Sequence, residues 1–416
     1  MRKKLVRLAG NKLIAGSLVM FSGTMVANVG NYIYHLLMGR MLGPVGYGEL
    51  QSVISVAYLL FIFISALALT TTKFIAGLKG RGDQAGIRWL FAVLNRKVLL
   101  AASVVLILTI LGSPLAKNFL HLHSTLPIIF AGLLFLISAL SSVNRAILQG
   151  LLRFKQIVQS HISETAFKVA AAVILVSLGW TVDGATLALV LASLVGLWTA
   201  FRFLKPLRHG RSSQPDLNKK IFLQYGLPVF FFNLSFTSLF TNDIILVKHF
   251  FPAYEAGLYA SLAVLGKIIF FATGAIPNVM FPMIVHRRSQ GKKIKHLLLA
   301  SLALLSIIAA AAVLVYWLFP KLMVRLLFGS DYLAIAPLLV WMAIFMSLYS
   351  LSYLLTSFSL SIEKTKVVFF GVAAALLQVT LIALFHQQLL QVVWISIGIT
   401  GCLFLSLVVY SFYGQK

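Results

Sequence analysis

The chain has 416 residues, of which 60% are hydrophobic and 11% are charged, and its mean hydropathy is +0.97. These values exclude an ordinary soluble domain and indicate an integral membrane protein. The formal charge of +26 would suit a nucleic-acid-binding protein, but the cations lie between long apolar runs, so membrane topology explains them better and we expect no nucleic-acid partner.

Twelve apolar runs follow one another along the chain, separated by charged residues, proline and glycine. A helix needs about 20 apolar residues to cross a hydrocarbon core about 30 Å thick. We therefore expect an all-α, polytopic membrane protein of about twelve transmembrane helices in two six-helix lobes. The expected spans are residues 13–38, 45–72, 98–116, 126–149, 155–178, 184–203, 220–247, 256–284, 296–319, 333–361, 365–385 and 390–413.

Most of the 35 lysines and arginines lie before the first span or in alternate connections. Because basic connections stay in the cytoplasm, this distribution predicts a multi-pass protein with cytoplasmic N- and C-termini. Of the lysines and arginines, the outer connections then contain only Arg40, Lys117, Lys248, Lys321 and Arg325.

The most polar connection follows the sixth span and contains two prolines, a glycine and a pair of serines. It predicts an N-terminal lobe of residues 1–204, a cytoplasmic linker of residues 205–219 and a C-terminal lobe of residues 220–416. When the first helices of the two lobes are aligned, polar residues coincide, and Gly48 falls opposite Gly257. We therefore expect the lobes to be parallel repeats.

The stretch LLMGRMLGPVGYGEL, residues 36–50, separates the first two spans. Glycine flexibility and the fixed φ of Pro44 predict a tight outer reversal there. The stretch FPAYEAGLY, residues 251–259, predicts the same joint in the second lobe. Arg40 lies at the first joint, where it is expected either to anchor outer-leaflet phosphates or to act as a gate residue that pairs across the lobes.

One face of the first helix of each lobe is polar. The residues on these faces are Asn28, Asn31 and His35 in the first lobe and Ser235, Ser238 and Asn242 in the second. Spacings of three and four residues place each set on one side of its helix. Two interpretations stay open, which are hydrogen bonds between helices, worth about 0.6 kcal/mol each, and the lining of a substrate cavity.

Five charged residues within the expected spans need an explanation. Glu164 and Lys168 are four residues apart on one helical face, so they form either a local ion pair or a proton- or cation-exchanging carboxylate beside a cation. Lys267 has no acidic residue one turn away and is expected to face a hydrated cavity that attracts an anionic headgroup. Asp243 is too short to reach the interface easily, whereas snorkelling accounts for Arg145.

Catalytic, metal and cofactor sites are not expected. The acidic residues are scattered, so no acid–base constellation is apparent and we expect no enzymatic activity. His121 and His123 have no carboxylate nearby in the sequence, which disfavours a metal site. The GPVGYG segment lacks the ending of a phosphate-binding loop, and no ATP-binding motif is present.

Three stretches resemble the lipid-linked oligosaccharide (O-antigen type) flippases, a polysaccharide biosynthesis family of the multidrug/oligosaccharidyl-lipid/polysaccharide exporter superfamily. Residues 31–60 resemble the start of that family, with a polar helix followed by Leu-Gly-Arg and Gly-Pro types of motif. Residues 144–180 resemble its fourth and fifth helices, and residues 242–284 resemble its seventh and eighth.

The resemblance implies a two-lobed transporter of the bacterial inner membrane that works by alternating access. Its substrate would be an undecaprenyl-pyrophosphate-linked oligosaccharide, moved from the inner to the outer leaflet for polysaccharide or lipopolysaccharide biosynthesis. The other implied partners are membrane lipids and polysaccharide polymerase machinery. In this interpretation Lys168, Lys267 and Arg40 compensate the pyrophosphate, and Glu164 and Asp243 couple transport to a proton or sodium gradient.

Three alternatives remain. A multidrug or cation exporter of the same superfamily would have an acidic and aromatic cavity. A membrane-embedded transferase would need clustered acid–base or metal-binding residues. A non-transporting scaffold of a polysaccharide assembly complex would not need paired polar faces.

Overall fold

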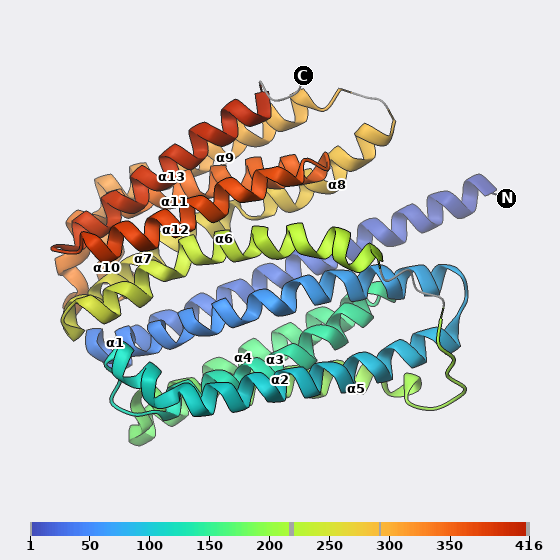
Figure 1. Ribbon diagram of the computed structural model, residues 1–416, viewed down its shortest axis with the longest axis horizontal. Helices are drawn as coiled ribbons and strands as arrows, with labels where there is room; N and C mark the ends of the chain where they lie inside the picture. The colour runs from blue at the N-terminus through green and yellow to red at the C-terminus, as the bar shows by residue number, and fades with distance from the viewer. Residues whose placement is uncertain (1, 216–219, 291–292, 413–416) are drawn as a thin grey trace. The chain divides into compact units, whose positions relative to one another are not determined.

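The computed structural model describes residues 2–215, 220–290 and 293–412, and every regular element in these ranges is a helix (Figure 1). The elements before the polar linker are α1 (Arg2–Gly80), α2 (Gln84–Leu120), α3 (Leu126–Gly150), α4 (Phe154–Leu175), η1 (Val176–Trp180) and α5 (Thr181–Phe203), followed by η2 (Lys205–Leu207). The later elements are α6 (Lys220–Phe250), α7 (Ala253–Thr273), α8 (Ala275–Ser289), α9 (Lys295–Leu318), α10 (Pro320–Leu327), η3 (Ser330–Leu338), α11 (Leu339–Ser361), η4 (Thr365–Val367), α12 (Val368–Leu384) and α13 (Leu389–Phe412).

Ten helical stretches in the described part of the chain are long and apolar enough to cross a membrane. Two of them, Ser22–Gly80 and Phe154–Phe203, contain 59 and 50 residues. At 1.5 Å per residue they would be about 90 and 75 Å long, far more than a bilayer core of about 30 Å. Each is interrupted by a glycine with positive φ, so each holds two spans, and the expected total of about twelve membrane helices is confirmed.

The first interruption is the reversal expected around Pro44. Gly43 has φ 64° and ψ 179°, a conformation that a side chain would strain, and Pro44 then begins the next helical segment with its fixed φ. The second joint is confirmed at the end of α6, where Phe251 and Pro252 separate α6 from α7. Gly179, with φ 89°, makes a similar turn between the fifth and sixth spans.

Two elements differ from the sequence expectation. α2 begins at Gln84, well before residue 98, because the Asp83 carboxylate caps it by accepting from Gly86 N at 2.7 Å, and Ile87, Leu90 and Phe91 bury one face. The helical turns of α2 before residue 98 contain charged residues, so they do not form an apolar run and were not predicted as part of a span. The short helix α10 was not expected at all, since its eight residues include Lys321 and Arg325.

The chain forms two compact units. The first unit comprises Met1–Met41 and Leu60–Leu227, and the second comprises Leu42–Leu59 and Pro228–Lys416. The lobe boundaries at residues 204 and 220 stay a prediction, but the contacts assign Leu42–Leu59 to the second unit. Residues 216–219 of the expected linker lie outside the described residues.

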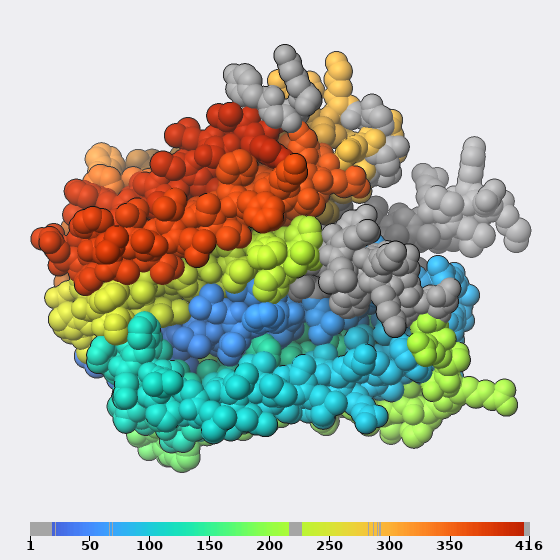
Figure 2. Space-filling model, viewed as in Figure 1, coloured from blue at the N-terminus to red at the C-terminus, as the bar shows by residue number. Residues whose placement is uncertain are grey.

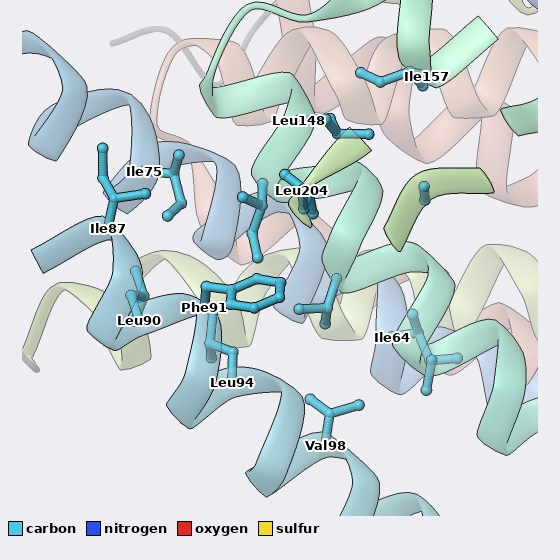
Figure 3. Close-up of a cluster of buried hydrophobic side chains, with 14 of the residues drawn as sticks. Ile64, Ile75, Ile87, Leu90, Phe91, Leu94, Val98, Leu148, Ile157 and Leu204 are labelled. Atoms are coloured by element: carbon cyan, nitrogen blue, oxygen red, sulfur yellow. The ribbon is translucent and has the colours of Figure 1, made fainter. Parts of the chain in front are cut away.

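An apolar cluster holds the first unit together. Ile75 of α1, Ile87 and Phe91 of α2, Leu148 of α3 and Leu204 after α5 are all at most 6% exposed and lie in one cluster (Figure 3). Each such side chain contributes about 1.5–3 kcal/mol when it is fully buried in a water-excluded core. The cluster therefore fixes the ends of these helices, on which the polar residues described below are mounted.

The outer side of α2 is apolar and exposed. Leu100, Leu108, Leu111 and Leu115 are 60–76% exposed, and α2 (cyan) forms a continuous surface in Figure 2. Exposed leucines at helical spacing suit the hydrocarbon of a bilayer, which favours apolar side chains over charged ones.

Two close packings organise the second unit. A methyl group on Gly48 would lie 2.8 Å from Gly257 Cα, so α1 and α7 touch at their backbones. The two glycines that the repeat alignment placed opposite each other are therefore in contact. α11 packs against α7, α8, α9 and α13, and Phe345, Met346 and Leu354 of α11 are fully buried, which makes α11 the central helix of this unit.

Candidate substrate and coupling sites

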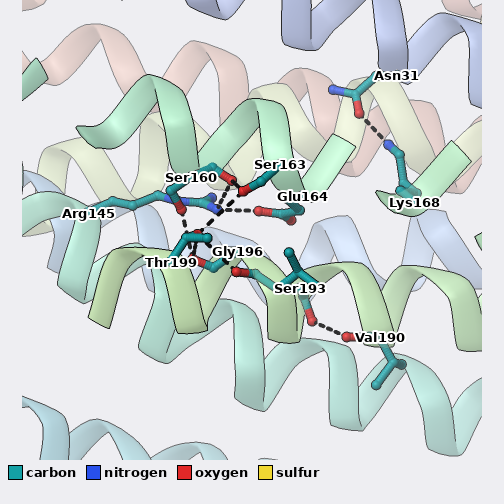
Figure 4. A network of polar contacts seen from close by, with 11 residues as sticks. Asn31, Arg145, Ser160, Ser163, Glu164, Lys168, Val190, Ser193, Gly196 and Thr199 are labelled. Carbon is teal, nitrogen blue, oxygen red and sulfur yellow. Dashed lines mark hydrogen bonds and ion pairs between the residues drawn. The ribbon is translucent and has the colours of Figure 1, made fainter. Parts of the chain in front are cut away.

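A polar network joins α3, α4 and α5 in the first unit. Arg145 Nη2 of α3 forms an ion pair with the Glu164 carboxylate of α4, and Arg145 Nε donates to Ser160 Oγ at 3.0 Å. Ser160 Oγ donates in turn to the carbonyl of Gly196 on α5 at 2.7 Å (Figure 4). The side chains of Arg145 and Glu164 are 13% and 26% exposed, so three helices share one partly enclosed charge pair.

This network corrects two expectations. Glu164 is paired with Arg145 of another helix, and not with Lys168 of its own helix. Arg145 does not snorkel to the membrane interface, because its guanidinium finds a carboxylate and a hydroxyl inside the unit. A planar guanidinium offers several donors in fixed directions, which suits it to bridge these acceptors.

Lys168 has a neutral partner instead of a carboxylate. Its ammonium donates to the Asn31 side-chain oxygen of α1 (Figure 4) and lies 4.9 Å from the centre of the Tyr34 ring. The Tyr34 hydroxyl donates to the Ala185 carbonyl at 3.1 Å, which ties α1 to α5. Because Arg145 balances Glu164, the group of Arg145, Glu164 and Lys168 keeps one positive charge.

The other polar residues of this face of α1 are partly enclosed. Asn28 and His35 are half-buried, like Asn31, and the His35 ring packs edge to face against Tyr34 at 5.4 Å. The structure therefore brings Lys168 to the polar face that the sequence analysis identified. Arg40, at the end of the same helical segment, is exposed.

The second unit contains a fully buried aspartate. Asp243 of α6 accepts from the Tyr259 hydroxyl of α7 at 2.8 Å and from Ile244 N at 2.9 Å. The Lys267 ammonium of α7 attracts the same carboxylate. Lys267 is 5% exposed and lies 4.0 Å from the centre of the Phe240 ring, so the Asp243 carboxylate, the Tyr259 hydroxyl and Lys267 form one enclosed group.

The surroundings of Lys267 differ from the expectation. Its acidic neighbour lies on the preceding helix, α6, where a search along its own helix could not find it. The lysine is also covered by Phe240 and, at 6.0 Å, by the Tyr58 ring, whereas a hydrated surrounding was expected. Aromatic rings attract cations through their electron-rich faces, which stabilises a lysine at this depth.

An aromatic cluster adjoins this group. Phe270 lies 5.8 Å from Phe240, 5.1 Å from Tyr349 and 5.4 Å from Tyr353, measured between ring centres. The Tyr349 hydroxyl donates to the Phe236 carbonyl at 3.0 Å. The cluster thus joins α6, α7 and α11 around the buried charges.

The polar face of α6 is divided between packing and partial exposure. Ser235 is 1% exposed, and its Oγ would lie 2.7 Å from a methyl group on Gly371 of α12. This residue therefore lies at a helix contact, but its hydroxyl donates to the Phe232 carbonyl of its own helix at 3.0 Å, so the expected hydrogen bond between helices stays a prediction. Ser238 and Asn242 are half-buried, so the cavity interpretation stays open for them.

Two further buried charged residues were missed by the sequence analysis. Glu49, 8% exposed, attracts the ammonium of Lys248, which is 2% exposed. The sequence placed Lys248 in an outer connection, but α6 continues to Phe250 and keeps this lysine inside the unit. An acidic residue inside the expected span of residues 45–72 was the signal that could have revealed Glu49.

The His121–His123 loop has an acidic neighbour that the sequence did not reveal. His123 Nε2 lies 3.2 Å from Asp183 Oδ1, and Ser124 Oγ donates to the same oxygen at 3.1 Å. This contact ties the α2–α3 loop to the start of α5. No group of three or more His, Cys, Asp or Glu side chains that could hold a metal ion occurs among the described residues.

Comparison with known proteins identifies the family. Residues 37–337 match the family model described as polysaccharide biosynthesis protein, and this range is more than half of the chain. The chain belongs to the polysaccharide biosynthesis protein family. An uncharacterized membrane protein of Methanocaldococcus jannaschii is 26% identical over 272 residues, which cover 61% of this chain and 63% of the relative. The alignment thus spans less than two thirds of that relative.

Solved structures show that this polysaccharide biosynthesis family member has the fold of the MOP superfamily. An inward-facing multidrug resistance MATE family transporter of that superfamily has a TM-score of 0.77 at 16% identity, covering 96% of this chain and 97% of that one. The MATE multidrug transporter DinF-BH has a TM-score of 0.70 at 16% identity, with 97% and 95% covered. A MOP superfamily transporter from Pyrococcus furiosus Vc1 has a TM-score of 0.64 at 18% identity, with 97% and 96% covered.

Proposed function

We propose that this membrane protein is a flippase that moves undecaprenyl-pyrophosphate-linked oligosaccharides from the inner to the outer leaflet of a bacterial inner membrane by alternating access. The family supports a role in polysaccharide biosynthesis. The fold supports transport over the membrane-embedded transferase alternative, because its solved neighbours are transporters.

The observation that best supports this proposal is the position and charge of Lys168. A cation at membrane depth is costly, about 2.5–3.5 kcal/mol on insertion scales, and is therefore a candidate for a functional group. Lys168 has the neutral Asn31 amide as its hydrogen-bond partner. The Glu164 carboxylate of the same helix attracts it but forms its ion pair with Arg145, so the three groups together keep one positive charge for a pyrophosphate. Lys267 is less suited to this role, because Asp243 and two aromatic rings already surround it.

A multidrug or cation exporter is the second candidate. The buried Asp243 carboxylate beside the aromatic cluster of α6, α7 and α11 is the observation that favours it. Against it, the P. furiosus neighbour carries a binding pocket whose reverse polarity is taken to suggest a different function. The net positive charge of Arg145, Glu164 and Lys168 would similarly favour an anionic substrate here.

The test is a translocation assay in proteoliposomes with a defined polyprenyl-pyrophosphate-linked oligosaccharide. Lys168→Ala should slow translocation at least about tenfold, since hydrogen bonds to charged groups contribute about 1.5–3 kcal/mol. Lys168→Arg should keep part of the rate. The matched control is Lys155→Ala, which removes an exposed lysine from the start of the same helix.

The same vesicles loaded with a cationic dye separate the two candidates. Dye export with no movement of the lipid-linked sugar would support the exporter. A wild-type translocation rate for Lys168→Ala, at equal protein incorporation, would remove Lys168 from the proposed substrate site.

A further inference from the structure

A groove of about 730 Å³ lies on the first unit, away from the residues proposed above. It is lined by residues of the end of α5 and the first half of α2, together with Leu140 of α3. Its lining residues are Asn95, Arg96, Leu99, Leu140, Leu194, Leu197, Trp198, Phe201, Arg202, Lys205 and Arg208. The volume falls in the range of about 300–1,000 Å³ that is typical of small-molecule sites.

One end of the groove is strongly basic. Arg96, Arg202, Lys205 and Arg208 line it, and no acidic residue is among the lining residues. Two of the guanidinium groups stack over rings of the same groove, Arg208 at 4.2 Å from Phe201 and Arg202 at 5.6 Å from Trp198. Such stacking holds a cation in place while leaving its edge donors available.

The other end of the groove is apolar and open to the side. Leu99, Leu194 and Trp198 line it and are 44%, 44% and 62% exposed. Leu194 lies eight residues before Arg202 on α5, which corresponds to about 12 Å along the helix. The groove therefore passes from charged to apolar over roughly the distance between a lipid phosphate and the first part of its acyl chain.

We propose that this groove is a binding site for an anionic phospholipid of the cytoplasmic leaflet. The cations receive the phosphodiester headgroup, and an acyl chain lies along Leu99, Leu140, Leu194 and Trp198. Basic pockets between membrane helices on the cytoplasmic side suit acidic headgroups. The positive-inside bias accounts for cations on this side, but it does not account for a concave site in which two arginines are stacked on its aromatic lining.

The lining favours a simple phospholipid over the lipid-linked sugar. Asn95 is its only uncharged side chain with both a donor and an acceptor group, and both are engaged. Its Nδ2 donates to the Phe91 carbonyl at 2.8 Å, and its Oδ1 accepts from Asn144 Nδ2 at 2.8 Å. The groove thus offers cations for a phosphate but no carboxylate, hydroxyl or unengaged amide for the hydroxyl groups of a glycan.

The proposal is tested with the purified full-length protein in a neutral detergent. Phosphatidylglycerol or phosphatidylcholine is titrated, retained lipid is counted by native mass spectrometry, and the melting temperature is followed as a measure of binding. We expect phosphatidylglycerol to bind and phosphatidylcholine not to. The triple variant Arg96→Gln, Arg202→Gln, Arg208→Gln should bind about fivefold more weakly for each charge removed.

The control triple variant is Arg81→Gln, Lys97→Gln, Lys155→Gln, which removes the same charge from exposed positions outside the groove. It should bind phosphatidylglycerol like the wild type, and equal weakening of both triple variants would overturn the proposal. Leu194→Trp keeps every cation but fills the apolar end, so it should also weaken binding. If the triple arginine variant does not fold, Leu194→Trp still tests whether the groove binds the lipid.

Competition identifies the source of the phosphate. Displacement of phosphatidylglycerol by inorganic phosphate at a similar concentration would make this a site for a soluble anion and overturn the proposal. Preferential displacement by undecaprenyl pyrophosphate would make it a substrate site and overturn it equally. Resistance to both competitors is the expected result.

Discussion

Two groups of charged side chains at membrane depth have the opposite charge on a neighbouring helix. Arg145 pairs with Glu164 in the first unit, and the Asp243 carboxylate has Tyr259 and Lys267 beside it in the second. An isolated charge in this environment is costly, and removing one member of a pair leaves the other uncompensated. Lys168 stands apart because its partner is a neutral amide.

Glu164→Gln should lower the stability of the purified protein. The substitution leaves the Arg145 guanidinium 13% exposed without its counter-charge, at an expected cost of about 1–3 kcal/mol. The melting temperature in detergent measures the effect.

The double variant Arg145→Leu, Glu164→Leu removes both charges and should recover most of that stability, because apolar replacements of a buried pair are often neutral. Glu363→Gln, at an exposed position, is the control. If Glu164→Gln melts like the wild type but loses its response to an ion gradient, the carboxylate serves coupling and not stability.

At the scale of helices, the second unit depends on one backbone contact. α1 and α7 meet at Gly48 and Gly257, with no side chain between them. Small residues allow membrane helices to approach closely, and van der Waals packing is a main source of helix association in lipid. Glu49 of α1, which follows Gly48, lies in the same unit and attracts Lys248 electrostatically.

Gly48→Ala should therefore destabilise the protein. The new methyl group would lie 2.8 Å from Gly257 Cα, and a main chain cannot rotate away as a side chain can, so we expect a loss of about 1–3 kcal/mol. Thermal unfolding in detergent measures the change.

Gly398→Ala is the matched control, because a methyl group there meets nothing within 4 Å. Alanine is a better helix former than glycine, so this variant should be as stable as the wild type or more stable by up to about 1 kcal/mol. Equal unfolding of the two variants would show that the α1–α7 contact is not tight.

At the scale of the whole molecule, about twelve membrane helices and the positions of the lysines and arginines in the connections predict a topology. If the basic connections are cytoplasmic, the α2–α3 loop is outside and the segment after α5 is inside. The family match extends over residues 37–337 and thus includes parts of both units.

Labelling with a membrane-impermeant maleimide tests this topology. In a Cys402→Ser background, which removes the single native cysteine, Asn118→Cys should react in intact cells. Arg211→Cys should react only after the membrane is permeabilised. Both positions are exposed, and the opposite labelling pattern would invert the orientation.

The sequence predicted the spans well because hydropathy reports directly which segments suit a bilayer. It also located the Gly-Pro reversal, the Phe-Pro reversal and the polar helical face that contains Asn31.

The sequence did not predict ion pairs and hydrogen bonds between different helices, because residue spacing along one helix says nothing about the neighbouring helices. A Glu164–Lys168 ion pair was one of two interpretations left open, whereas Arg145 of α3 is the partner of Glu164. Lys267 was not expected to interact with Asp243. Helix α10 was not predicted, because a short helix with charged residues contains no long apolar run.

The assignment of Leu42–Leu59 to the second unit has a consequence for biosynthesis. The ribosome makes this segment, with buried Glu49, Gln51 and Ser52, before any of the other helices of its unit. At about 5–20 residues per second, α7 begins to emerge roughly 10–40 s after residue 59. During that interval these three side chains lack the helices that bury them in the finished unit.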